Sequence, residues 1–372
     1  QIKQILNNLF FETIENKVRV PSFRNDILTA NDIAEEIARV IGYNNIPSQK
    51  INLPKVEKDF SLPNFLRKFL TKNGFTEVEA KAGVHYGTYK VFVNFIPVAD
   101  ITQLVSEIFI QSAKENNPIK SVLHFAGLKS VAESIEKPLL YWDANVIGTI
   151  KLLEVMNLHN CNNLVFSSSA TIYGKTKEKY IKEDSDIKPI NPYGFTKAAI
   201  EQILVDLQKS SKSKWRIANL RYFNPIGSHE SGMIGESPNG TPNNLFPYLT
   251  QVALGNKKEL MIYGDNWPTS DGTGVRDYIH VMDLAEGHFA ALKYIEDHHP
   301  QTLKVNLGTR KGTSVLELVN TFEKVNNCKI PITIKTRRLG DVAQTIAENK
   351  LALSLLEWKP KRNIYDNWYR RY

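Results

Sequence analysis

The 372-residue sequence predicts an α/β fold built on a doubly wound parallel sheet. Short, nearly continuous apolar stretches such as "SVLHFAG" (121–127) and "NLVFSSS" (163–169) are typical of strands that are buried on both faces. Longer stretches with apolar residues at helical spacing separate them. Ligands of such sheets bind outside the carboxyl ends of the strands. We therefore look for a functional site among the residues that follow each strand.

The first part of the chain predicts a small, separate α+β domain at 1–60. "VRVPSFRNDI" (18–27) predicts a strand that ends in a Pro turn, and "TANDIAEEIARVIGYNNIP" (29–47) predicts a helix with an apolar stripe. A linker at 47–60 follows. A junction at 61–95 begins with one amphipathic helix, "LPNFLRKFLTKNGFTEVEA" (62–80).

The main domain is expected at 96–372, where strands and helices alternate. In order, we expect strand 91–100, helix 100–116, strand 121–127, helix 141–158, strand 163–169, a helix opened by Tyr193, and strands 216–224 and 304–308. Residues 225–300 are richer in Gly, Pro and Asn and predict a loop-rich lobe over the strand ends. The cofactor part of this domain is expected mainly at 96–224 and the substrate lobe mainly at 225–372.

Composition narrows the class of protein. The two cysteines, Cys161 and Cys328, form neither a disulfide framework nor a metal-ligand cluster, so we expect no metal site. No signal peptide and no apolar run near 18 residues is seen, which favours a cytoplasmic protein without a membrane partner. The net charge of +8 comes from scattered lysines and favours a solvated surface over a nucleic-acid face.

The spacing Tyr-x-x-x-Lys offers one candidate for chemistry. It occurs three times: at Tyr86/Lys90, Tyr173/Lys177 and Tyr193/Lys197. The first pair lies in a predicted strand, where residues four apart are about 13 Å apart, and the second lies in a predicted polar loop. Only the third lies in a predicted helix, where residues four apart share one face. Tyr193 and Lys197 are therefore the candidate pair.

Six motifs give the main domain a family resemblance. In order along the chain they are "VLHFAGLKSVAES", "VFSSSATIYG", "NPYGFTK", "LRYFNPIG", "GTPNNLFPY" and "DGTGVRDYIHVMDLA". They resemble UDP-glucose 4-epimerase, a member of the extended short-chain dehydrogenase/reductase family. The resemblance implies a Rossmann-like fold, NAD as cofactor and the interconversion of UDP-glucose and UDP-galactose.

The resemblance also implies catalytic roles. Tyr193 would be the acid/base, and Lys197 together with the positive nicotinamide would favour its phenolate and lower its pKa. Ser169 would hydrogen-bond the sugar 4-hydroxyl and relay its proton. Hydride would pass from C4 to NAD and return to the other face of the 4-keto sugar. From the residues alone, Ser167 and Ser168 are expected to pack at the strand end, and His124 in the core.

Further contacts follow from the motifs. The resemblance implies cofactor contacts by Asp100, Ile101, Phe125, Ala126, Gly127, Lys129, Asn145 and Phe223. It implies substrate contacts by Asn224, Asn244, Leu245, Met261, Ile262, Tyr263, Arg276, Arg338, Asp341 and Thr345. From the residues alone, Asn145 could instead bind only backbone groups, and Arg276 could instead form an ion pair with Asp277. Threonine at 345 is small, which implies room for UDP-N-acetylhexosamines. A homodimer through helices near 141–158 and 192–208 is also implied.

One family feature is missing from this sequence. The family opens with Gly-x-x-Gly-x-x-Gly between a strand and a helix, and no such pattern occurs here. We therefore expect a truncated cofactor fold and weak or absent NAD binding. Residues 1–80 instead resemble the phenylalanyl-tRNA synthetase beta subunit, beginning with its B5 domain, so the chain looks like two unrelated genes joined near 80–95.

Two other functions stay open. One is an inactive or non-catalytic chimera with tRNA as a partner. The other is a different nucleotide-sugar oxidoreductase or dehydratase. A 4,6-dehydratase would need a carboxylate near Ser169, and "SSSAT" contains none.

Overall fold

The computed structural model describes residues 98–210, 213–229, 242, 244–338 and 341–364, together with positions 6, 11–14, 17–19 and 33. The chain divides into two compact units, residues 1–60 and 61–372. Each is described by itself. None of the helices in the described ranges is both long and apolar enough to cross a membrane.

The described part of the first unit is a short hairpin. Strands β1 (Glu12–Ile14) and β2 (Lys17–Arg19) pair antiparallel, and Leu6 and Phe11 form a small buried cluster beside them. The predicted strand at 18–27 overlaps β2. Ile33 is helical, as predicted. The rest of that helix, the helix predicted at 62–80 and the Tyr86/Lys90 pair lie outside the described residues.

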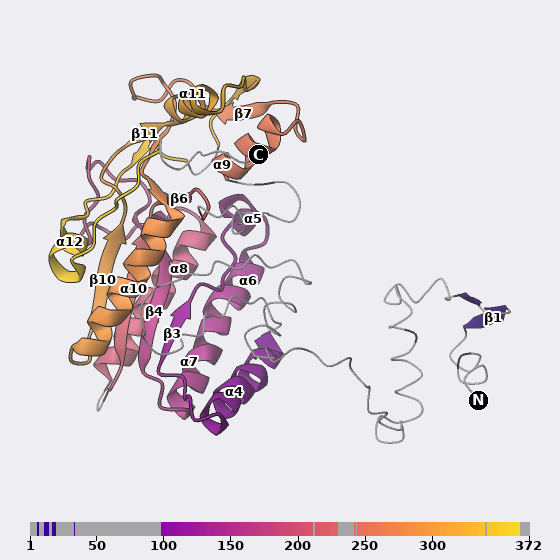
Figure 1. Cartoon of the computed structure of the whole chain (residues 1–372), viewed down its shortest axis with the longest axis vertical. Coiled ribbons are helices and arrows are strands. Elements are labelled where there is room, and N and C mark those ends of the chain that lie inside the picture. The colour runs from indigo at the N-terminus through magenta and orange to yellow at the C-terminus, as the bar shows by residue number, and fades with distance from the viewer. Residues whose placement is uncertain are drawn as a thin grey trace. The chain divides into compact units, whose positions relative to one another are not determined.

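The second unit is built on a four-stranded parallel sheet in the order β10-β5-β4-β3 (Figure 1). Its strands are β3 (Ser121–His124), β4 (Asn163–Ser169), β5 (Arg216–Tyr222) and β10 (Thr302–Leu307). The strands predicted at these positions are confirmed, and the doubly wound parallel sheet is confirmed with them. The stretch 98–100, predicted as the end of a strand, is instead the first turn of helix α4 (Val98–Lys114).

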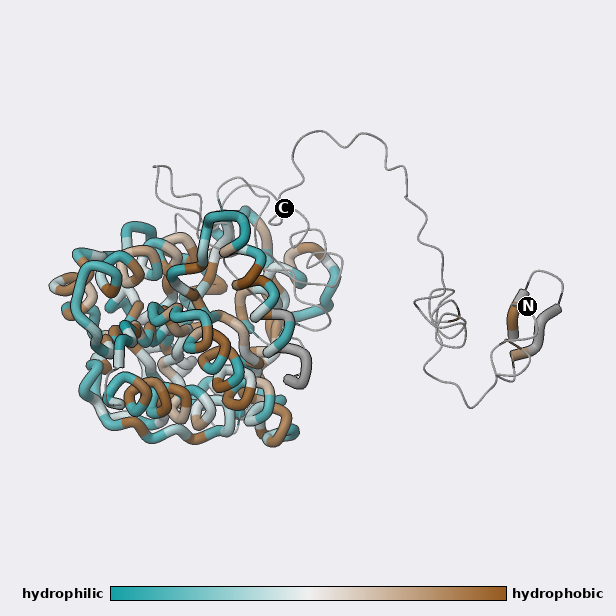
Figure 2. Tube along the Cα trace, turned by 90° about the horizontal axis from the view of Figure 1, so that it is seen from below, coloured by the Kyte–Doolittle hydropathy of each residue, from teal (hydrophilic) through white to brown (hydrophobic). Residues whose placement is uncertain are grey.

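Helices cover both faces of this sheet. Successive strand residues point to opposite faces. Leu164 and Ile217 therefore pack with α4, α7 (Gly148–Leu158) and α8 (Pro192–Lys209). Val165 and Ala218 pack with α10 (Val281–Asp297) and α12 (Lys350–Leu356). Figure 2 shows hydrophobic and hydrophilic stretches alternating along the coils of the second unit, as expected of helices that bury one stripe.

The helix predicted at 141–158 is three segments. These are α6 (Pro138–Tyr141), a π-helical turn η2 (Trp142–Ile147) and α7, and they follow α5 (Val131–Glu136). Single π turns inside α-helices are frequent at functional sites. The π turn here carries Asn145.

A second lobe gathers at one end of the sheet, with α9 (Leu245–Ala253), α11 (Val315–Asn326) and β7 (Leu260–Tyr263) around their own core (Figure 1). Three small sheets complete it: β7 with β12 (Ile332–Lys335), β6 (Asn224–Ile226) with β9 (Tyr278–His280), and β8 (Val275–Arg276) between β11 (Thr313–Ser314) and β13 (Gln344–Thr345). The loop-rich region expected at 225–300 thus contains α9 and α10, and α10 packs on the main sheet.

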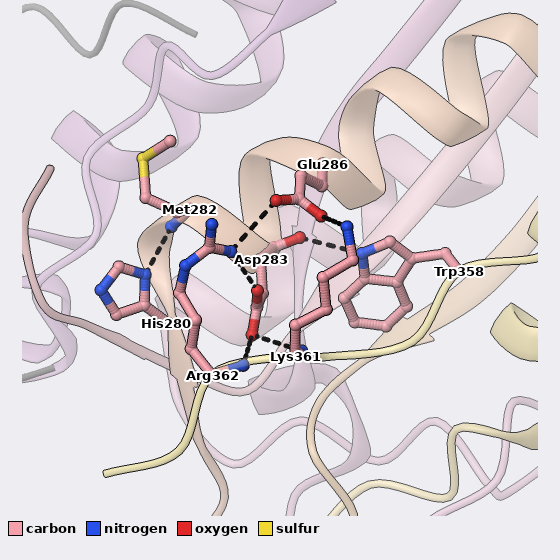
Figure 3. Close-up of polar contacts among 7 residues, drawn as sticks. All are labelled: His280, Met282, Asp283, Glu286, Trp358, Lys361 and Arg362. Atoms are coloured by element: carbon pink, nitrogen blue, oxygen red, sulfur yellow. Dashed lines mark hydrogen bonds and ion pairs between the residues drawn. The ribbon is translucent and has the colours of Figure 1, made fainter. Parts of the chain in front are cut away.

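The segment after α12 is bound to the start of α10. Figure 3 shows the contacts among His280, Met282, Asp283, Glu286, Trp358, Lys361 and Arg362. The buried Asp283 carboxylate accepts hydrogen bonds from the backbone N–H groups of Lys361 (3.0 Å) and Arg362 (2.9 Å), and from the Arg362 guanidinium. One carboxylate therefore holds the C-terminal segment against the helix.

Candidate active site

The start of α8 places Tyr193 beside the end of β4. The side chain of Asn191 caps the helix by accepting from Gly194 N–H (2.9 Å), and Pro192 occupies the first turn. A Cβ on Gly194 would lie 2.9 Å from the Thr171 carbonyl, so the helix and the turn after β4 approach at van der Waals distance. That turn, η3 (Ala170–Tyr173), directly follows Ser169.

Ser169 and Tyr193 are hydrogen-bonded to each other. The Ser169 oxygen also accepts from the Thr171 backbone N–H (3.3 Å) and from the Thr171 hydroxyl (2.9 Å). Because the oxygen already accepts twice, its own proton is directed at the Tyr193 phenol. A Ser–Tyr pair arranged in this way can pass a proton between the phenol and a third hydroxyl.

Burial sets the charge state of the pair in the protein chain alone. Burial raises the pKa of Tyr193, and the hydrogen bond from Ser169 opposes that rise. Lys197 was expected to lower this pKa, but its ammonium donates to the Ser167 carbonyl (2.7 Å) and lies 4.7 Å from the Phe166 ring centroid. Burial lowers the pKa of Lys197 itself to about 7. In the protein chain alone, the phenol is therefore protonated at neutral pH.

The loop after β3 closes the other side of this site. The Asn145 amide accepts from Leu128 N–H (2.7 Å) and donates to the Leu128 carbonyl (3.0 Å). A Cβ on Gly127 would lie 3.2 Å from Asn145 Oδ1 and 3.5 Å from Lys197 Nζ. Gly127, Asn145 and Lys197 are thus brought together. Asn145 binds the backbone of the loop that shapes the site, and it also donates to the Thr196 hydroxyl (3.1 Å), so it does not bind backbone alone.

The remaining predicted cofactor residues are spread more widely. The Phe125 ring is tilted against that of His288 with ring centroids 4.8 Å apart, Ala126 is half-buried and Lys129 is exposed. Phe223 is buried in a cluster with Ala170 and Tyr173. Asp100 and Ile101 lie in the first turns of α4, and their side chains are outside the described part of the structure.

Arg276 and Thr345 face each other across the parallel strands β8 and β13. Both side chains are half-buried. The alternative considered for Arg276, an ion pair with Asp277, is not formed. The Asp277 carboxylate accepts instead from Thr309 and from the backbone N–H of Arg310. Arg276 instead donates to the Val275 carbonyl (2.8 Å).

The other predicted substrate residues lie in the second lobe. Arg338 lies 3.7 Å from the Tyr263 ring centroid, and the Asp341 N–H donates to the Arg338 carbonyl (3.3 Å). Ile262 is buried in the core of this lobe, and Leu245 packs against that core. Met261 is exposed. Asn244 is the exposed residue before α9, and Asn224 begins β6. These residues are placed on the lobe but are not in contact with the Tyr193–Ser169 pair through any described hydrogen bond.

Sequence reasoning missed a buried ion pair next to the site, between Glu201 on α8 and Arg221 on β5 (2.7 Å). A signal existed, because "ANLRYF" sets an arginine in the middle of an apolar buried strand. Such a residue is almost never fully buried unless it is paired. Tyr173, rejected as a loop residue, is also buried, in η3, and its hydroxyl contacts Arg221 (2.8 Å).

Metal ligands do not gather in the described ranges. No group of three or more His, Cys, Asp and Glu side chains there could hold a metal ion.

Comparison with family models divides the chain in two. Residues 99–368 match the model for GDP-mannose 4,6 dehydratase, and residues 1–43 match the model for the tRNA synthetase B5 domain. A third match, to the catalytic subunit of poly(A) polymerase, covers residues 57–128 and overlaps the first.

Known relatives and structures give a closer assignment. UDP-glucose 4-epimerase 2 of Arabidopsis thaliana is 54% identical over 244 residues, which are 66% of this chain and 69% of that protein. The bifunctional UDP-glucose 4-epimerase and UDP-xylose 4-epimerase 1 of Pisum sativum is 51% identical over 245 residues, 66% of this chain and 70% of that protein. The Bifidobacterium longum UDP-glucose 4-epimerase in complex with NAD+ and UDP is similar in structure, with a TM-score of 0.69, 46% identity and coverage of 73% of this chain and 79% of that one. The chain therefore belongs to the UDP-glucose 4-epimerase family.

Proposed function

We propose that residues 96–372 form the catalytic part of an enzyme that interconverts UDP-glucose and UDP-galactose. The hydrogen bond between Ser169 and Tyr193 at the end of β4 is the observation that carries the proposal. Relatives at about half identity are named for this activity. Enzymes of this fold class bind their ligands at the carboxyl ends of the parallel strands, where Ser169 lies.

The residues of the chain would move one proton. Ser169 would exchange its hydrogen bond from the Thr171 hydroxyl for one from the sugar 4-hydroxyl and relay the proton to the Tyr193 phenolate, the form that Lys197 and the positive charge of bound NAD would favour. Tyr193 would return the proton after the 4-keto sugar has turned over. NAD, when bound, supplies the acceptor and donor of the C4 hydride. Lys197 and Gly127 would line the nicotinamide end, because a Cβ at position 127 would lie 3.2 Å from Asn145 Oδ1 and 3.5 Å from Lys197 Nζ, and glycine leaves that space to the cofactor.

Binding of the adenine and pyrophosphate end of NAD has weaker support. The sequence holds no Gly-x-x-Gly-x-x-Gly pattern, which in this fold lets the backbone donate to the pyrophosphate. Structures of relatives bound to NAD favour NAD as the cofactor. We therefore propose that this chain binds NAD weakly and that completing its cofactor unit raises the affinity.

Two alternatives within nucleotide-sugar chemistry differ in support. The family model described as a 4,6-dehydratase favours that reaction, but β4 and η3 carry no carboxylate at 167–171. Relatives named for UDP-xylose epimerisation favour a UDP-pentose as a second substrate.

The partners proposed are a UDP-sugar and a second copy of this chain. Helices α6, η2, α7 and α8 expose large apolar side chains: Leu139, Leu140, Trp142, Ile147, Leu158 and Phe195. Exposed apolar groups gathered on adjacent helices are typical of a protein interface. Light scattering should therefore give the mass of a dimer, and Leu139→Glu should lower it. The proposal of a tRNA partner rests only on the match of residues 1–43 to the tRNA synthetase B5 domain. A cytoplasmic location is proposed from the sequence.

The test uses the full chain and a second version in which an intact cofactor unit from a relative replaces residues 1–95. Calorimetry with NAD and conversion of UDP-glucose to UDP-galactose are measured for both. We expect weak NAD binding in the full chain, and binding with turnover in the second version. Tight NAD binding by the full chain would contradict the role given to the glycine-rich unit. A second version that binds NAD without converting UDP-glucose would leave the inactive chimera as the better description.

A further inference from the structure

Glu201, one helical turn after Lys197 on α8, forms a buried ion pair with Arg221 through two hydrogen bonds. Glu201 is 2% exposed and Arg221 is completely buried. Glu201 Oε1 accepts from Arg221 Nε (3.0 Å), and Oε2 accepts from Arg221 Nη2 (2.7 Å). The hydroxyl of Ser168 also donates to Glu201 (2.5 Å). This one carboxylate therefore joins α8 to β5 and to the end of β4.

The other side of the Arg221 guanidinium contacts η3 and the loop that follows it. Its Nη1 donates to the Tyr173 hydroxyl (2.8 Å) and to the Glu183 carbonyl (2.8 Å). The Tyr173 hydroxyl donates in turn to Asn306 on β10 (2.7 Å). Because η3 begins directly after Ser169, the guanidinium fixes the turn that follows the proton-relaying serine.

Stability alone does not explain such a pair. Taking two charges out of water is costly, and replacing a buried ion pair by apolar residues is often neutral or stabilising. Glu201 and Lys197 are four residues apart on α8 and therefore share one face. Burial lowers the pKa of Lys197 to about 7, and the Glu201 carboxylate acts against that lowering. The carboxylate thus bears on the charge of the lysine as well as on its place.

We propose that Glu201, held by Arg221, is a positioning residue of the candidate active site, which fixes the Lys197 helix against the strand end that carries Ser169 and places a carboxylate on the helix face of the Lys197 side chain. This inference rests on the proposed function only in the use made of Lys197. Its test needs no turnover.

Few other charges face Lys197. Tyr193 and Glu201 lie on its own helix, and His124 lies on β3. His124 has a pKa lowered to about 3 by burial and by the lysine, so it is neutral near pH 7. Strand β4 offers the Ser167 carbonyl and the Phe166 ring, and η2 offers the Asn145 amide, none of which titrates. Glu201 is therefore the carboxylate whose removal changes the field at the lysine.

The experiment follows the Lys197 titration in the full chain by NMR of 13C-labelled lysine, with the resonance assigned by its loss in Lys197→Arg. The titrations of Glu201→Gln and Arg221→Met are compared with that of the parent. We expect the Lys197 pKa to fall by about one unit in Glu201→Gln, which is the low end for loss of a nearby opposite charge. We expect it to rise in Arg221→Met, which leaves the Glu201 charge uncompensated. Asp206→Asn, an exposed carboxylate on the same helix, is the matched control and should change nothing.

A purely structural pair gives a different pattern. If Glu201 and Arg221 only hold the helix in place, either variant loosens it, and the Lys197 pKa rises in both toward the ordinary 10.5. That result, or an unchanged Lys197 titration in Glu201→Gln, overturns the proposal. Should Glu201→Gln fail to fold, Glu201→Gln/Arg221→Met removes both buried charges together, and its Lys197 pKa is compared with that of Arg221→Met alone. A lower Lys197 pKa in the double variant than in Arg221→Met supports the proposal, and an equal or higher one overturns it.

Discussion

The ammonium of Lys197 and the carbonyl of Ser167 are joined by a hydrogen bond of 2.7 Å. Ser167 lies two residues before Ser169, so the lysine ties α8 to the strand end that carries the serine. Tyr193, one turn earlier on α8, meets Ser169 through its phenol. The helix and the strand thus hold the tyrosine and the serine in register, and the lysine is the clamp between them.

Replacing Tyr193 with Phe should remove the acid/base and leave the fold intact. We expect turnover to fall on the order of 100-fold or more, the usual scale for general acid–base work. The measurement is the rate of UDP-glucose conversion by the version with an intact cofactor unit. Tyr173→Phe is the comparison, because its hydroxyl bonds to Arg221 and Asn306 on the far side of the turn. Equal losses of turnover in the two variants would mean that Tyr193 acts only through folding.

Tyr173→Phe should instead lower the stability of the folded chain. The change removes one acceptor of the Arg221 guanidinium and the donor to Asn306 Oδ1, all of them buried. An unsatisfied buried group costs about 1–3 kcal/mol, and we expect the free energy of unfolding to fall by that amount. Urea unfolding followed by circular dichroism measures it. The control is Tyr180→Phe, because the Tyr180 ring faces Arg310 and keeps this contact as Phe. Equal stability of the two variants would contradict the prediction.

Two buried histidines should make the fold sensitive to acid. Burial lowers the pKa of His124 to about 3 and that of His288 to about 4. Below about pH 6.5 the unfolded chain binds protons at both rings and the folded chain does not, so the free energy of unfolding falls as the pH falls. The fall should continue to about pH 4 for His288 and about pH 3 for His124. Each pKa unit of difference corresponds to about 1.4 kcal/mol.

The measurement is urea unfolding at several pH values between 7 and 4.5. His124→Gln should flatten the dependence, because an amide can still donate to the Thr149 hydroxyl that His124 contacts at 2.8 Å but does not titrate. His298→Gln is the control, since His298 is exposed. A stability that is constant from pH 7 to 4.5 in the parent would show that both rings are protonated without cost.

Removing Asp283 should release the C-terminal segment. Asp283→Ala leaves two backbone N–H groups without their acceptor and leaves the Arg362 guanidinium with Glu286 alone (3.0 Å) (Figure 3). We expect the free energy of unfolding to fall by about 1–3 kcal/mol and amide exchange at 358–364 to speed up. Arg362→Met should do less, because Asp283 keeps both backbone donors. If Arg362→Met destabilises the chain more than Asp283→Ala, the guanidinium, and not the backbone contacts, holds the segment.

The sheet and the helix that carries Tyr193 and Lys197 were readable from the sequence for two reasons. A strand buried on both faces must be apolar throughout, and a tyrosine and a lysine four apart can meet only on a helix. Strand β4 was therefore predicted at 163–169 and observed there. The Tyr193 helix was likewise found from its apolar spacing.

The features that escaped prediction depend on contacts between distant segments. The π turn at Trp142–Ile147 has no local signal, because its Asn145 is held by the backbone of Leu128, seventeen residues away. The Glu201–Arg221 pair spans twenty residues and becomes visible only when α8 lies on β5. The pKa of Tyr193 depends on how deeply the phenol is buried, and periodicity does not report depth.

The size of the residue at position 345 should set which sugars the enzyme accepts. Thr345 is half-buried on β13, opposite Arg276 on β8, and its carbonyl accepts from Asp277 N–H (3.0 Å). The backbone of residue 345 makes that bond, so Thr345→Tyr keeps the strand while it adds bulk. We expect the version with an intact cofactor unit to convert both UDP-glucose and UDP-N-acetylglucosamine, and Thr345→Tyr to lose N-acetyl turnover by at least about tenfold while it keeps glucose turnover. Thr345→Ser, which stays small, should keep both activities. Equal effects of Thr345→Tyr on the two sugars, or no N-acetyl turnover before the change, would place the limit on substrate size elsewhere in the lobe.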